Sequence, residues 1–217
     1  MKKKNQIVPV TSKLIQRVSN VLSITEKISG ETSLSVQGNT FTDPRDGQVY
    51  KTVRLKDGKI WMAQNLNFDV GEDCWFYDDD PENGKKYGRL YTWEAAKRAC
   101  PPGWHIPSDD EWWEMAKHYG MAEYYDAGEK KNSDADAGKA AYKSLLEGGD
   151  SGFSALLGGS RWTSGDFSSL GSSGGYWSSS EQSSSNAWNY NFSSSFKYLY
   201  RYNSYKSWGF SCRCVQD

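Results

Sequence analysis

The chain brings few reactive side chains together in sequence. Its two histidines are His105, in the segment WHIPSD that enters a predicted helix, and His118, on the polar side of that helix. Ser-His-Asp catalysis needs a histidine held between a nucleophile and a carboxylate, whereas a histidine at a helix entry is more typical of packing or capping. The sequence therefore predicts a protein that is not an enzyme.

Cysteines are the other candidates for chemistry. Cys74, Cys100, Cys212 and Cys214 are too sparse for a disulfide scaffold and lack the C-x-x-C spacing of zinc sites. A cation can activate a thiol, but Arg213, between the last two cysteines, would point to the opposite face of a strand. In a reducing cytoplasm all four are expected to be thiols. The pairing to test is Cys100 with Cys214, although position alone does not choose between Cys212 and Cys214.

An acidic loop over residues 78–82 offers carboxylate oxygens that could bind a metal ion. Asp78, Asp79, Asp80 and Glu82 could hold calcium, which binds several oxygens. A solvated acidic turn explains the same residues and is favoured. We therefore expect neither a metal nor a cofactor.

The stretch best suited to binding runs from Gly174 to Cys214 and mixes Tyr and Trp with Ser and Asn. Disordered segments are poor in aromatic residues, so this stretch is expected to be ordered. Tyr and Trp supply rigid contact area, while Ser and Asn supply adaptable hydrogen bonds, as in antibody binding loops. The composition therefore indicates a binding surface.

An ordinary sheet is the alternative interpretation of the same stretch. Trp188, Phe192 and Phe196 have a spacing that suits one buried face. The three tyrosines within residues 198–202 fit this interpretation less well, because the opposite face of their strand carries a leucine, an arginine and an asparagine.

Length and charge limit the class of protein. The 217 residues carry a formal net charge of -1, which suits one large domain with or without a short appendage and gives no basic surface for nucleic acid. After the MKKKN start, no apolar run typical of an export signal follows, and no segment is long enough to span a membrane. The expected location is the cytoplasm, or a phage particle assembled there.

Residues 1–40 are expected to lie outside the main domain, which would occupy 41–217. An amphipathic helix is predicted over 10–29 from apolar residues at helical spacing. These residues are Leu14, Val18, Val21, Leu22 and Ile28. The helix would either dock on its own domain or mediate self-association or binding to a carrier protein. The small polar residues of 31–40 predict a linker.

The main domain is expected to begin with short strands and turns and to continue with two helices, over 92–100 and 108–119. Ser108 and Glu111 have the spacing of a capping box at the start of the second helix. A further short helix is predicted over 136–146. The tryptophans expected in the core are Trp93, Trp104 and Trp112.

Five motifs, in this order, resemble the Fibrobacter succinogenes major paralogous domain. They are GKIWMAQNLNF (58–68), YGRLYTWEAAKRACPPGWHIPSDDEW (87–112), GFSALLGGSR (152–161), GGYWSSSE (174–181) and GFSCRCVQD (209–217). The resemblance covers the chain from about Phe41 to its end. It implies an α+β, C-type lectin-like fold with two helices and an irregular, loop-rich antiparallel sheet, here preceded by the N-terminal helix.

The last stretch also resembles the variable proteins of diversity-generating retroelements. Their variable region ends just before a GFSVRCV-like motif, and residues 183–208 precede GFSCRCV, with Cys212 in place of the usual valine. In that family, adenine-directed mutagenesis turns Asn codons into codons for Asn, Ser, Tyr and similar residues. The ligand-binding positions that the resemblance implies are Tyr190, Ser193, Ser194, Tyr198, Tyr200, Tyr202, Asn203, Ser204, Tyr205 and Trp208.

Three functions are compatible with these features. The leading hypothesis is a non-catalytic protein that displays a diversified surface, rich in Tyr, Ser and Asn, to a protein ligand. The first alternative is an adhesive or structural component of a phage or cell surface that binds glycans. The second is an oxidase similar to formylglycine-generating enzymes, which share the broad fold and need reactive cysteines.

Overall fold

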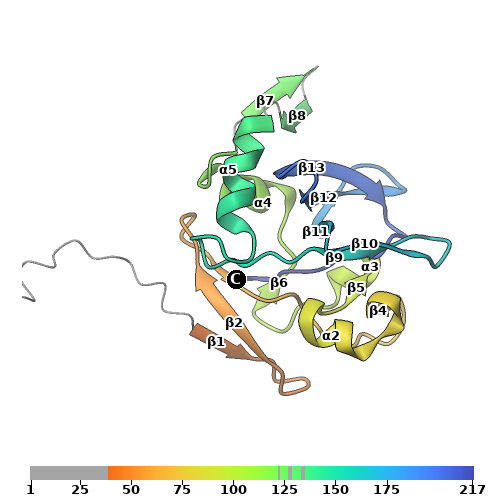
Figure 1. Ribbon diagram of the computed structural model, residues 1–217. Coiled ribbons are helices and arrows are strands. Elements are labelled where there is room, and N and C mark those ends of the chain that lie inside the picture. The colour runs from red at the N-terminus through yellow and green to blue at the C-terminus, as the bar shows by residue number, and fades with distance from the viewer. Residues whose placement is uncertain (1–38, 122, 127–128, 133–134) are drawn as a thin grey trace, which may run out of the picture. The chain divides into compact units, whose positions relative to one another are not determined.

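The computed structural model describes residues 39–121, 123–126, 129–132 and 135–217 (Figure 1). The first of its two five-stranded sheets has the order β1-β2-β3-β14-β6. Its strands are β1 (Asn39–Thr42), β2 (Val49–Arg54), β3 (Ile60–Met62), β6 (Trp104–His105) and β14 (Val215–Gln216). The turns before and after β2 contain Gly47 and Gly58 at φ 77° and 83°, a backbone conformation that glycine adopts without steric cost.

The second sheet has the order β10-β9-β11-β12-β13. Its strands are β9 (Gly158–Arg161), β10 (Phe167–Leu170), β11 (Ser173–Glu181), β12 (Asn186–Ser193) and β13 (Tyr198–Tyr205). The last three strands form an antiparallel meander. Two small ladders stand apart: β4 (Cys74–Trp75) with β5 (Leu90–Tyr91), and β7 (Glu123–Asp126) with β8 (Glu129–Asn132).

The helices of the described residues are short. They are the 3₁₀ turn η1 (Tyr77–Asp79), α2 (Pro81–Tyr87), α3 (Trp93–Lys97), α4 (Asp109–Lys117) and α5 (Ala135–Leu145). Thr92 accepts a hydrogen bond from Ala95 N at the start of α3, and Ser108 and Glu111 close the expected capping box at the start of α4. The three helices predicted in the main domain are confirmed: α3 and α4 are shorter than predicted, and α5 begins and ends one residue earlier than predicted.

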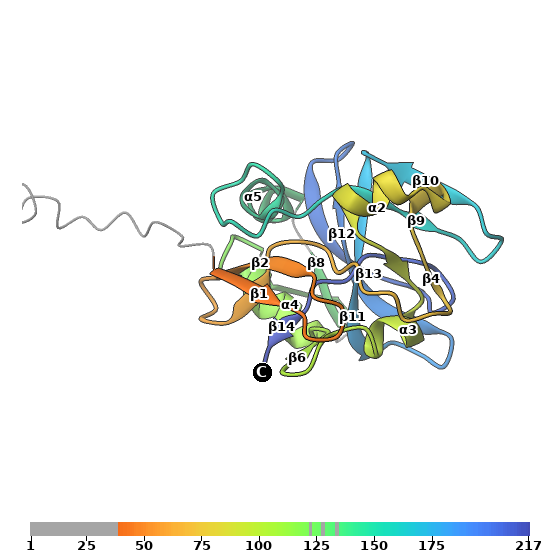
Figure 2. The same ribbon diagram turned by 90° about the horizontal axis from the view of Figure 1, so that it is seen from below.

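Helix α4 lies between the two large sheets, with β1 and β2 on one side and β12 and β13 on the other (Figures 1 and 2). Its Trp112 is fully buried and stacks on Tyr190 of β12, with ring centroids 5.1 Å apart. A second apolar cluster contains Trp93, Trp104 and Trp177. The prediction that Trp93, Trp104 and Trp112 are core residues is confirmed.

The expected fold class is wrong. About 36% of the structure is strand and about 20% is helix, and the strands form two curled half-barrel sheets, so the structure is mostly β rather than an α+β, C-type lectin-like fold. The two capped helices dominate the sequence pattern because caps and apolar stripes are strong local signals. The Gly- and Ser-rich strands β9 to β11 carry weak local signals and acquire their pairing only from partners distant in sequence. The expected N-terminal helix over 10–29 lies outside the described residues.

The end of the chain is joined to the helical region in two ways. Strand β14 inserts between β3 and β6, where Val215 lies opposite both Trp61 and His105. Cys100 and Cys214 form a disulfide with a Cα–Cα distance of 5.9 Å, and Cys74 and Cys212 are free thiols. The expectation of four thiols is therefore wrong for the first pair, and the pairing selected for testing is the one observed.

Candidate functional site

Strands β12 and β13 form the hairpin at one edge of the second sheet. Asn191 lies opposite Tyr200, and Tyr190 lies opposite Arg201. Because side chains alternate along a strand, the hairpin has two faces. We call the face that packs toward α4 the inner face and the opposite one the outer face.

The outer face carries three aromatic rings in a row, Tyr198, Tyr200 and Tyr202, which we call the tyrosine ladder. Successive ring centroids are 5.1 Å and 6.3 Å apart, within the range of favourable aromatic pairs. Phe196, in the turn before β13, extends the row at 5.5 Å from Tyr198. Because Phe196 is 64% exposed and Tyr202 is 57% exposed, the row offers a contact surface to a partner.

Uncharged polar groups accompany the ladder. Asn191 lies beside Tyr200 on the neighbouring strand, and its side-chain oxygen accepts a hydrogen bond of 2.6 Å from Ser173 Oγ. Partial burial, and then the neighbouring Tyr198 and Tyr202, raise the pKa of Tyr200. Its phenol therefore keeps its proton at neutral pH and can both donate and accept. The ladder is suited to binding by ring contact and hydrogen bonding.

A second aromatic group, which we call the tryptophan corner, consists of Trp162, Tyr205 and Trp208. The rings of Trp162 and Trp208 are stacked, with centroids 5.7 Å apart and planes 9° from parallel, and Tyr205 packs on Trp208 at 6.1 Å. Trp162 is 47% exposed and Tyr205 is 56% exposed. A hydrogen bond of 2.8 Å between the hydroxyls of Thr163 and Ser207 ties the two chain segments together beside the stack.

The inner face is fastened to the start of α4 through Asp109. The fully buried Tyr190 donates its hydroxyl proton toward Asp109, whose backbone and side-chain oxygens are 3.0 and 3.1 Å away. Arg201 donates from Nε and Nη2 to the two carboxylate oxygens of Asp109 at 2.7 and 2.8 Å. Its guanidinium also lies 3.2 Å from the ring centroid of Trp188. A bidentate, largely buried contact of this kind holds one geometry, so the hairpin presents its outer face from a rigid base.

The structure separates the ten predicted positions into two groups. Exposed or half-buried are Ser194, Tyr198, Tyr200, Tyr202, Asn203, Tyr205 and Trp208. Buried are Tyr190, Ser193 and Ser204. In the buried group Ser204 Oγ accepts a hydrogen bond of 3.0 Å from Asn189 Nδ2, so its role is in the framework.

Three surface residues were missing from the sequence prediction: Asn191, Phe196 and Trp162. The pattern placed Phe196 on a buried face with Phe192, but only Phe192 is in the core. Strand β12 ends at Ser193, and the following turn, with Lys197 at φ 55°, breaks the alternation on which that prediction rested. No local signal connects Trp162 to the hairpin.

Of the candidate catalytic groups, Cys212 and Arg213 are enclosed and His105 is partly exposed. Cys212 is fully buried, and burial raises the pKa of its thiol. Arg213 is also fully buried and donates to Asn65 Oδ1 at 2.7 Å. His105 contacts the carboxylates of Asp217 and Glu111, at 2.5 Å and 3.0 Å.

The acidic loop has structural partners. Asp80 caps α2 by accepting a hydrogen bond of 2.9 Å from Glu82 N, and Glu82 pairs with Lys85 at 2.5 Å. Among the residues that the structure describes, no three His, Cys, Asp or Glu side chains are grouped so that they could hold a metal ion.

Comparisons with known proteins identify one family. The model of the Fibrobacter succinogenes major domain matches residues 50–216. No curated protein and no solved structure matches the chain. Within the described part of the chain, no helix combines the length and apolar character needed to cross a membrane.

Proposed function

Because this chain belongs to the Fibrobacter succinogenes major domain family, with residues 50–216 matched, and carries an aromatic outer face on its edge hairpin, we propose that it is a non-catalytic binding protein. Its ligand is a protein, and the tyrosine ladder provides the main contact. The observation that supports this proposal most directly is the row of partly exposed rings from Phe196 to Tyr202, set on a hairpin whose other face is locked to α4.

The chemistry of the ladder favours a protein ligand. Tyrosine has few rotatable bonds for its contact area, so ordering it at an interface costs little conformational entropy. Exposed aromatic residues are also enriched among the side chains that contribute most to protein interfaces. The tyrosine ladder and the tryptophan corner contain no charged side chain, so binding would depend weakly on salt.

We also propose that the outer face is diversified by a retroelement, as the resemblance of residues 183–208 implies. The support is that exposed positions such as Tyr202 and Tyr205 can change without opening the core. Tyr190, Ser193 and Ser204 lie in the same stretch but are buried, so functional variants should keep small or hydrogen-bonding residues there. A nearby reverse transcriptase gene, and a near-copy of this coding segment differing only at adenines, would support diversification. Their absence would contradict it.

The cysteines support a role without catalysis. A nucleophilic thiolate needs access to substrate and a lowered pKa, whereas Cys212 is buried with a raised pKa and Cys214 is held in a disulfide. An oxidase similar to formylglycine-generating enzymes would need at least one of them to reach substrate.

The disulfide bears on where the protein works. Disulfides persist in oxidising surroundings and are rare in the reducing cytoplasm. The Cys100–Cys214 bond therefore favours display on a phage particle or cell surface over a cytoplasmic role. Alkylation of free thiols in the denatured, unreduced protein followed by mass measurement would detect two modified cysteines in the first case and four in the second.

The binding proposal is tested by capture. The full chain is immobilised and exposed to surface proteins extracted from candidate host cells, beside a variant with Tyr198, Tyr200 and Tyr202 changed to Ser. We expect a captured protein to be lost with the variant and retained with Val49→Ser, which removes an exposed apolar residue from β2. Capture that survives the triple substitution would contradict the proposal. A captured ligand that resists protease but is destroyed by periodate would favour the glycan-binding alternative.

A further inference from the structure

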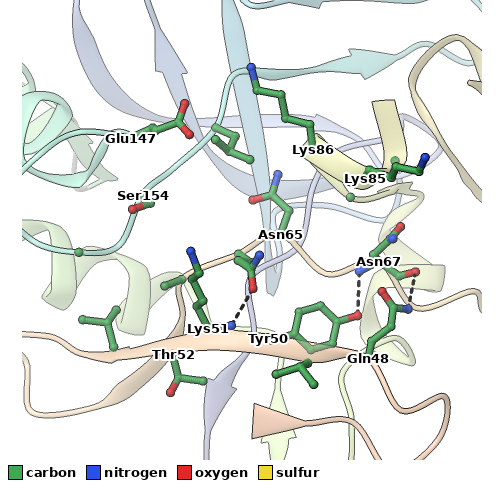
Figure 3. A pocket seen from close by; sticks show the side chains of 18 residues that line it. Gln48, Tyr50, Lys51, Thr52, Asn65, Asn67, Lys85, Lys86, Glu147 and Ser154 are labelled. Atoms are coloured by element: carbon green, nitrogen blue, oxygen red, sulfur yellow. Dashed lines mark hydrogen bonds between the residues drawn. The ribbon is translucent and has the colours of Figure 1, made fainter. Parts of the chain in front are cut away.

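A groove of about 750 Å³ lies between β2, α2 and residues 147–156 (Figure 3). None of its lining residues belongs to the tyrosine ladder or the tryptophan corner. A volume of this size is typical of sites for small organic ligands. The groove is therefore a separate candidate site.

The charge of the groove is predominantly positive. Lys51 of β2 and Lys85 and Lys86 of α2 line it together with a single carboxylate, that of Glu147. Figure 3 shows Lys51 and Lys86 extending from opposite sides. Lys85 pairs with Glu82 at 2.5 Å, whereas within the described residues neither Lys51 nor Lys86 has an ion-pair partner. Lys86 lies 4.9 Å from the ring centroid of Tyr87, a neutral group that leaves its charge uncompensated, so both cations can pair with an anionic ligand.

Side-chain amides line the groove together with these lysines. The Oε1 atom of Gln64 accepts a hydrogen bond of 2.7 Å from Lys51 N, which leaves its NH₂ group as a donor. The Oδ1 atom of Asn67 is buried and has no hydrogen-bond partner among the described residues. A buried acceptor without a partner costs free energy, so a rotation of the Asn67 amide that let a ligand hydroxyl donate to its oxygen would stabilise the site. Amides both donate and accept, as the hydroxyls of a sugar ring do.

Arg213 fixes the positions of the segments that line the groove. Its guanidinium donates to Met62 O at 3.1 Å, to Asn65 Oδ1 at 2.7 Å and to the backbone oxygens of Phe153 and Ser154. These contacts connect the segment after β3 to the segment around Ser154. Ser154 itself adopts φ 56°, a left-handed conformation that is unfavourable for serine. Such strain persists only when surrounding contacts fix it, so the groove is pre-formed.

The lining distinguishes between classes of anion. Phosphate is typically bound by the bidentate fork of arginine or by a helix N-terminus, and the described lining contains no arginine and no first turn of a helix. Separated lysines among amides suit an extended, hydroxylated ligand with charges at intervals. We propose that this groove binds an anionic oligosaccharide, with Lys51 and Lys86 contacting its acidic groups and Gln64 and Asn67 its hydroxyls.

The test uses calorimetric titration of the full chain with a tetramer of galacturonic acid, a sulfated tetramer of galactose, the neutral tetramer of galactose and hexaglutamate. We expect one or both anionic saccharides to bind, which also distinguishes carboxylate from sulfate. Lys51→Gln and Lys86→Gln should each lower the association constant about tenfold. The matched control is Arg54→Gln, on β2 but outside the groove lining, which should bind as the unmodified protein does.

Three results would overturn the proposal. These are no binding of either anionic saccharide, equal binding of the neutral tetramer or hexaglutamate, and lysine variants that bind unchanged. The triple Tyr→Ser variant of the ladder should keep the saccharide affinity, so loss of protein capture and loss of saccharide binding are separate outcomes. Melting curves of each variant confirm that a lost affinity does not reflect unfolding.

Discussion

The two faces of the β12–β13 hairpin use the same residue type for opposite purposes. Tyr190, on the inner face, is fully buried, stacks on Trp112 and hydrogen-bonds to Asp109. Tyr202, on the outer face, is 57% exposed and contacts Tyr200. The difference shows that the surroundings of a tyrosine, rather than the residue type, decide whether its ring is buried in the core or exposed to solvent.

The largest effect on stability is expected from removing the ring of Trp112, on which the inner face of the hairpin packs. Trp112→Ala should lower the free energy of unfolding by about 3–5 kcal/mol, because it removes a large, fully buried side chain and leaves a cavity. Urea unfolding measures this change. An unchanged midpoint would mean that α4 does not support the hairpin.

A matched pair of single-atom deletions compares the faces directly. Tyr190→Phe should cost about 1–3 kcal/mol, because Asp109 loses a buried hydrogen-bond donor. Tyr200→Phe removes the same hydroxyl from the outer face and should leave the free energy of unfolding within about 0.5 kcal/mol of its original value. Equal costs at the two positions would remove the distinction between the faces.

Removal of the three ladder tyrosines together with the exposed Tyr205 tests the comparison further. Changing Tyr198, Tyr200, Tyr202 and Tyr205 to Ser should lower the free energy of unfolding by no more than about 2 kcal/mol, since substitutions at exposed positions have small effects. Thermal unfolding followed by circular dichroism should stay cooperative. If cooperativity is lost, the ladder is part of the core.

A pH dependence of the stability is expected at the start of α4. Burial raises the pKa of Glu111, but hydrogen bonds from Lys59, the Ser108 backbone and His105 outweigh it and lower the pKa to about 2, from an ordinary value of 4.5. Because the folded-state pKa is depressed, this carboxylate stabilises the fold fully above pH 4.5, and the contribution is lost as the pH falls toward 2. The difference in stability between the original protein and Glu111→Gln should therefore shrink across that window.

His105 should respond in the opposite direction. Burial lowers its pKa, but contacts with Asp217 and Glu111 outweigh burial and raise the pKa above 6.5. Its contribution is therefore complete below pH 6.5 and lost as the pH rises through the folded-state pKa. Unfolding of His105→Gln at pH 5.5 and pH 9 measures this: the deficit relative to the original protein should be larger at the lower pH.

Local signals in the sequence determined the helix starts, the turns and the apolar tryptophans of this protein. Thr92 and Ser108 cap α3 and α4 because their side chains satisfy backbone N–H groups a few residues away, and such contacts need no distant partner. The five motifs, in their order along the chain, were also sufficient to identify the family. The expectation about fold class failed because the pairing of the Gly- and Ser-rich strands depends on segments far apart in the chain.

Only the tertiary structure decided which aromatic residues reach solvent and which cysteines pair. Alternation places Tyr200 and Tyr190 on opposite faces, but whether a face is covered depends on where α4 packs. The insertion of β14 between β3 and β6 brings Cys214 to Cys100 across 114 positions of sequence. Arg213 likewise joins segments beside the groove that are far apart in the sequence. Long-range contacts of this kind depend on the packing of the whole chain, and no local pattern encodes them.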